Sequence, residues 1–124
     1  MINIPVSIGE LYDKYTILEI KKQKMVDIEK LEMIDKELKY LNQYTDNFTL
    51  DVTILNKLRH VNKTLWDIED NIREKEKKKE FDKEFIELAR SVYITNDLRC
   101  EVKNEINILL KSSLFEIKSY ANYK

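Results

Sequence analysis

The sequence predicts an all-α fold, an antiparallel helical bundle with four main helices and a short C-terminal helix. Glycine and proline occur once each in 124 residues, so very few positions interrupt a helix. Apolar residues recur at steps of three and four along most of the chain, which is the spacing of one helix face. The connections between these stretches are short, and short connections favour antiparallel neighbours.

The first predicted helix follows an extended arm at residues 1–6. Ser7 and Glu10 have the spacing of a capping box, so we expect the helix to begin there and to run to about Lys24. Its apolar residues fall on two faces, one of which carries Ile17. A helix of this kind is either central in a bundle or covered by a partner.

The next two helices are predicted from a cap, a loop signal and a regular apolar seam. Asp27 is the expected N-cap of a helix that ends near Tyr44, before the loop signal at residues 45–47. The third helix should run from about Thr49 to about Lys78 with heptad spacing. Its seam consists of Ile54, Leu58, Val61, Leu65, Ile68 and Ile72.

The last part of the chain is expected to form a charged turn and two helices. Residues 73–84 are almost entirely charged with mixed signs, which is typical of a solvated helical tip. A long helix should run from about Asp82 to Lys111. Ser113 and Glu116 have capping-box spacing and predict a short fifth helix.

Composition indicates a single globular domain over residues 1–124 in a reducing compartment. Charged residues make up 36% and hydrophobic residues 43%, which suits amphipathic helices and is too apolar for a disordered chain. The formal net charge of −1 counts against nucleic-acid binding. Cys100 is the only cysteine, and no signal peptide or membrane span is evident, so we expect a cytoplasmic protein.

The fourth helix breaks its own apolar pattern in the middle. The inward row continues through Asn96, Arg99 and Lys103 before apolar residues resume. A buried charge is costly unless it is paired and hydrogen-bonded. One interpretation is an internal salt-bridge network that fixes the register of the helices. The alternative is a pocket that binds an anionic ligand, because a guanidinium group can form two parallel hydrogen bonds with a phosphate or carboxylate.

Partners for these two cations are available on two other predicted helices. The first helix offers Glu10, Asp13, Lys14 and Glu19, and the third offers Asn62, Trp66, Glu69, Asp70 and Arg73. We centre the pocket hypothesis on Arg99, Lys103, Glu69 and Asp70. Trp66 is more often a core or interface residue than a ligand-stacking one.

Several kinds of site are not expected. Gly9 is the only glycine, which removes glycine-rich phosphate loops. His60 has no second ligand at zinc spacing, so no metal and no cofactor are expected. RNA binding through residues 75–83 is disfavoured because glutamates interrupt the basic run. No catalytic residue can be assigned, and whether the chain is an enzyme stays open.

Three stretches together resemble a family of small uncharacterised helical proteins and domains of bacteria. They are PVSIGELYDKYTILEIKKQK (5–24), LWDIEDNIREKE (65–76) and LARSVYITNDLRCEVKNEIN (88–107), followed by KSY (118–120). Some members are associated with glycosyltransferase and tetratricopeptide-repeat proteins of surface-polysaccharide assembly. The polar motif of the family matches Glu10, Asp13, Lys14, Glu19, Asn62, Trp66, Glu69, Asp70, Arg73, Arg90, Asn96, Asp97, Arg99 and Lys103. The resemblance adds Asp97 to the candidate ligand-binding residues and implies no established activity.

Two functions are therefore carried forward. The first is a helical accessory or interaction module whose partner is another protein or a second copy of the chain, so that a homo-oligomer is expected. It would use the second apolar face of the first helix and the seam of the third. The alternative is a protein or enzyme that binds a small anionic ligand, such as a nucleotide, a nucleotide-sugar or a sugar phosphate.

Overall fold

The computed structural model describes residues 1–118 and 121–123 and contains four helices in that part of the chain. They are α1 (Ile8–Lys24), α2 (Ile28–Thr45), α3 (Val52–Lys78) and α4 (Lys83–Leu109). The described residues contain no strand, and residues 1–6 form an exposed arm without helix. The prediction of an all-helical chain with four main helices is confirmed.

Side-chain caps set the first residue of each helix. The Ser7 hydroxyl accepts a hydrogen bond from the Glu10 N–H at 3.0 Å, as expected at a capped start. Aspartates cap the other three helices in the same way: Asp27, Asp51 and Asp82. Asp51 explains why α3 begins at Val52 and not near Thr49, as the sequence had suggested.

The turn between α3 and α4 is held by Lys75. Its ammonium group lies 3.3 Å from Glu80, 3.0 Å from Asp82 and 3.0 Å from Glu84. These carboxylates, Asp82 foremost, hold the pKa of Lys75 well above its usual range. The charged segment at residues 73–84 thus neutralises part of its own charge at an exposed tip.

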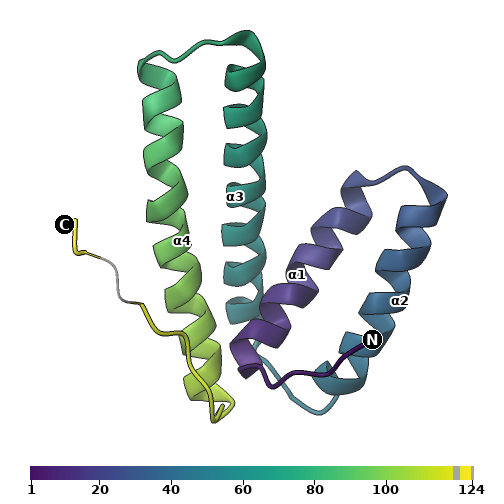
Figure 1. The fold of residues 1–124 in the computed structure, drawn as a ribbon. Coiled ribbons are helices and arrows are strands. Elements are labelled where there is room, and N and C mark those ends of the chain that lie inside the picture. The colour runs from purple at the N-terminus through teal and green to yellow at the C-terminus, as the bar shows by residue number, and fades with distance from the viewer. Residues whose placement is uncertain (119–120, 124) are drawn as a thin grey trace.

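α1 is the central helix of the molecule. It contacts α2, α3 and α4, whereas α2 contacts α1 alone. Figure 1 shows α3 and α4 as a long antiparallel hairpin, with α1 against its lower half and α2 on the outer side of α1. This position explains the two apolar faces of α1, because Leu11, Leu18 and Ile20 are all buried within the chain itself.

The main core lies where α1 meets the α3–α4 hairpin. Its buried members are Tyr12, Leu58, Val61, Leu65, Val102 and Ile106. Three residues of the seam predicted for the third helix are therefore used inside the chain. That part of the seam does not offer an open face to a partner.

The predicted fifth helix is wrong. No residue from Leu110 to Lys118 is helical, and Lys111 has a left-handed φ of 57° just after α4. The Glu116 N–H donates to Asn104 Oδ1 at 2.9 Å, and the Glu116 carbonyl accepts from Asn104 Nδ2 at 3.1 Å. One amide of α4 thus takes the two backbone groups of Glu116 that a helix would have used. Of the motif residues 118–120, the last two lie outside the described residues.

Candidate functional site

Gly9 lies where α1 packs closely against α4. A Cβ atom at this position would be 2.3 Å from the carbonyl oxygen of Lys103, a backbone atom that cannot rotate away. The Gly9 N–H donates to Asn107 Oδ1 at 2.6 Å, and the Ile8 N–H donates to Ser112 Oγ at 3.1 Å. N–H groups in the first turn of a helix have no partner within that helix. Here the end of α4 and the residues after it supply the partners.

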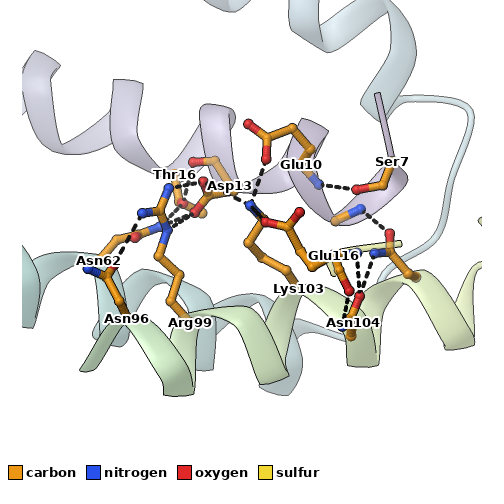
Figure 2. Close-up of polar contacts among 12 residues, drawn as sticks. Ser7, Glu10, Asp13, Thr16, Asn62, Asn96, Arg99, Lys103, Asn104 and Glu116 are labelled. Atoms are coloured by element: carbon orange, nitrogen blue, oxygen red, sulfur yellow. Dashed lines mark hydrogen bonds and ion pairs between the residues drawn. The ribbon is translucent and has the colours of Figure 1, made fainter. Parts of the chain in front are cut away.

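Asp13 is the centre of a polar cluster between α1, α3 and α4 (Figure 2). Its side chain is only 1% exposed. The Arg99 guanidinium donates from Nε to Asp13 Oδ1 at 2.9 Å and from Nη2 to Oδ2, so one carboxylate holds one edge of the guanidinium. Asn62 Nδ2 donates to Asp13 Oδ1 at 2.9 Å and to Thr16 Oγ1 at 2.8 Å. The hydrogen bond to Asp13 raises the pKa of Arg99 further above its ordinary value.

Lys103 is the second cation of the cluster, and its side chain is 5% exposed. Its ammonium group donates to Glu10 Oε2 at 2.6 Å and to Glu116 Oε1, and it lies 3.8 Å from Asp13 Oδ2. Burial lowers the pKa of this ammonium group, but the hydrogen bonds to Glu10 and Glu116 and the nearby charge of Asp13 together raise it more. The pKa of Lys103 therefore lies above its ordinary value of 10.5.

The structure brings together six of the residues that the sequence singled out. The assembled residues are Glu10, Asp13, Asn62, Asn96, Arg99 and Lys103, with Asn96 Oδ1 accepting from Arg99 Nη1 at 3.5 Å. Exposed residues that pair with neither cation are Lys14, Glu69, Asp70 and Arg73. Trp66 is half-buried, and Asp97 accepts hydrogen bonds from Lys118 and Tyr123. The acids beside the two cations come from α1 and the C-terminal segment, and not from Glu69 and Asp70.

An open groove of about 1000 Å³ runs beside the cluster, between α4 and the last described residues. Arg99, Lys103 and Cys100 line it. At its rim the Tyr123 hydroxyl donates to Asp97 at 2.7 Å, and this bond raises the pKa of Tyr123 to about 12. Burial raises the pKa of the Cys100 thiol, so the reactive thiolate form is disfavoured at neutral pH.

Comparisons with protein-family models, curated proteins and solved structures gave no match. Among the described residues, no helix is both long and apolar enough to cross a membrane.

The cluster contains more negative than positive charge. Arg99 and Lys103 face three carboxylates, those of Glu10, Asp13 and Glu116. Every buried side-chain nitrogen or oxygen in the described part of the chain has a hydrogen-bond partner. An added anion would meet excess negative charge and no free buried donor. The geometry therefore favours a structural network that fixes α1 on α4 over a pocket for an anionic ligand.

Five members of the network were missing from the sequence-predicted set: Thr16, Asn104, Asn107, Ser112 and Glu116. Asn107 follows Lys103 by one helical step of four, so the inward polar row could have been continued to it. Thr16 follows Asp13 by a step of three in the same way. Ser112 and Glu116 lie beyond α4 in non-helical backbone, where helical spacing gives no signal.

The raised pKa of Lys103 predicts a loss of stability in alkaline solution. The folded chain holds the Lys103 proton to higher pH than the unfolded chain does, so this stabilisation is complete below about pH 10.5. It is lost as the pH rises through the folded-state pKa. We expect the free energy of unfolding, measured with urea from about pH 9 to pH 11.5, to fall more steeply for the wild type than for Lys103→Arg, whose guanidinium stays protonated.

Tyrosines titrate in the same pH range, but they do so in both proteins. The difference between the two slopes therefore reports on Lys103. Equal slopes would contradict the role assigned to its ion pairs.

Proposed function

We propose that this chain is a helical interaction module and that one exposed side of α2 is its binding surface. Met33, Tyr40 and Tyr44 form a row along this side, which we call the α2 row. Their exposed fractions are 72%, 39% and 53%. Steps of seven and four residues keep the three side chains on one side of a helix. Aromatic residues and methionine are enriched at protein interfaces, so the α2 row is the observation that carries the proposal.

The polar cluster has a supporting role in this proposal. The hydrogen bonds of Asp13 and Lys103 hold α1 on the α3–α4 hairpin. α1 in turn holds α2 through the buried Ile34 and an ion pair between Lys22 and Asp35 at 2.8 Å. These contacts therefore fix the position of the helix that carries the α2 row. The family resemblance supports a biological process for this module, the assembly of surface polysaccharides.

The proposal is tested by placing a photo-crosslinking phenylalanine analogue at Tyr40 in the cells that produce this protein. We expect irradiation to give a covalent adduct with a protein. The matched control is the same analogue at Phe81, an aromatic residue that is 55% exposed at the hairpin tip, away from the row. No adduct from position 40, or equal adducts from both positions, would overturn the proposal.

The anionic-ligand alternative makes a different prediction for the purified protein. A ligand present at a hundredfold excess over its dissociation constant would stabilise the fold by about 2.7 kcal/mol and raise the melting temperature by several degrees. We expect phosphate, nucleotides, nucleotide-sugars and dicarboxylates to give no such shift. A shift that disappears in Arg99→Met would favour the alternative.

A further inference from the structure

The α2 row lies between two lines of opposite charges. Lys30 and Glu37 lie on one side of it, and Glu29 and Lys36 lie on the other, because each residue turns the helix by about 100°. All four side chains are exposed, and none forms an ion pair within the described residues. The order of the charges along the chain is reversed between the two lines. Within each line the two charges have opposite signs. Each line therefore places opposite charges side by side when it faces the same line of a second, antiparallel α2.

We propose that α2 pairs in antiparallel orientation with α2 of a second copy of this chain, with Met33 at the two-fold axis. The inference rests on the proposed function and names its partner. In this register Lys30 lies beside Glu37 of the second copy, and Glu29 lies beside Lys36 of the second copy. A two-fold axis generates each of these pairs twice. Four opposite-charge pairs therefore flank the apolar contact.

The same register places Tyr40 beside the start of α2 of the second copy. Val26 lies in the non-helical link two residues before α2 begins at Ile28, and its side chain is 92% exposed. An exposed apolar residue is therefore present at that end of the pairing. The fold leaves this face open, because α2 contacts only α1 and lies on the outside of the molecule (Figure 1).

Charge also selects between two possible registers. Sliding the helices until Met33 opposes Tyr44 of the second copy would bring more aromatic surface together. It would also bring Glu37 within one turn of Glu37 of the second copy, and it would separate the opposite charges. Like charges on facing helices oppose association. In the register centred on Met33 the two helices overlap over residues 28–38, which indicates a small interface and a weak, reversible dimer.

Sedimentation velocity over a range of concentrations, with charge-reversal variants, tests the pairing. We expect the wild-type chain to show a reversible monomer–dimer equilibrium. Glu37→Lys puts two lysines together at two symmetric positions, and it should weaken the dimer about tenfold. The double variant Lys30→Glu/Glu37→Lys restores opposite charges in the reversed order, and it should dimerise within about threefold of the wild type.

Glu32→Lys is the matched control, because it makes the same change on the same helix but outside the row and its flanks. It should leave the dimer unchanged, and circular dichroism should show all variants folded. A chain that stays monomeric at every concentration, or a dimer that the double variant does not restore, overturns the pairing. Neither result overturns the proposed function, which fails only when crosslinking from Tyr40 gives no specific adduct.

Discussion

Replacing Asp13 with asparagine should lower the free energy of unfolding by about 3 kcal/mol. The carboxylate is 1% exposed and holds the Nε–Nη2 edge of Arg99. Without its charge, Arg99 loses its carboxylate partner whereas Lys103 keeps Glu10 and Glu116, and breaking a buried ion pair from one side costs about 3–5 kcal/mol. The expected loss lies at the lower end of this range because the Arg99 side chain is 28% exposed and regains some hydration. Urea unfolding followed by circular dichroism measures the change.

Two further variants separate the cluster from ordinary surface pairs. Asp13→Asn/Arg99→Met removes both charges, so it should recover more than half of the stability that the single change loses. Glu19→Gln breaks a more exposed pair, in which Arg59 Nε donates to Glu19 Oε1 at 3.0 Å, and it should cost less than about 1 kcal/mol. An Asp13→Asn variant as stable as Glu19→Gln would show that the cluster does not hold the helices together.

The helices could be predicted because their determinants are local in sequence. Ser7 and Asp27 cap the helices that they were expected to cap, and apolar residues recur at steps of three and four along most of each helix. The fifth helix fails for the opposite reason. Ser113 and Glu116 have capping-box spacing, but Glu116 is bound by Asn104 and Lys103 of α4 instead. These contacts between distant residues prevent the helix that the local sequence predicts.

The candidate site could be predicted only in part. Helical phase placed Arg99 and Lys103 on the inner side of α4, and both side chains are at least partly buried there. Phase cannot say which neighbouring helix supplies the acids. That depends on how α1 crosses α4, and the crossing depends on the contact at Gly9. The crossing of α1 over α4 therefore places Glu10 and Asp13 of α1 beside the two cations, and not the acids of α3.

Gly9→Ala should reverse the usual effect of this substitution. Within a helix, alanine in place of glycine normally stabilises by about 0.5–1 kcal/mol. At Gly9 the new Cβ would lie 2.3 Å from the Lys103 carbonyl oxygen and 2.9 Å from the Lys103 carbonyl carbon. α1 must then move away from α4, which lengthens the 2.6 Å hydrogen bond from Gly9 to Asn107. We expect a loss of about 3 kcal/mol, measured by urea unfolding with the single tryptophan, Trp66, as a fluorescent probe.

Lys14→Ala is the control, because Lys14 is exposed on the same helix, and its replacement should change stability by less than about 0.5 kcal/mol. A Gly9→Ala variant as stable as the wild type would mean that α1 and α4 do not approach this closely. The geometry described for the polar cluster would then also be wrong. The α2 row does not contact this crossing, since α2 packs on α1 alone. Gly9→Ala should therefore still dimerise at temperatures where it remains folded, which makes the register of α1 on α4 and the pairing of α2 separable properties of one chain.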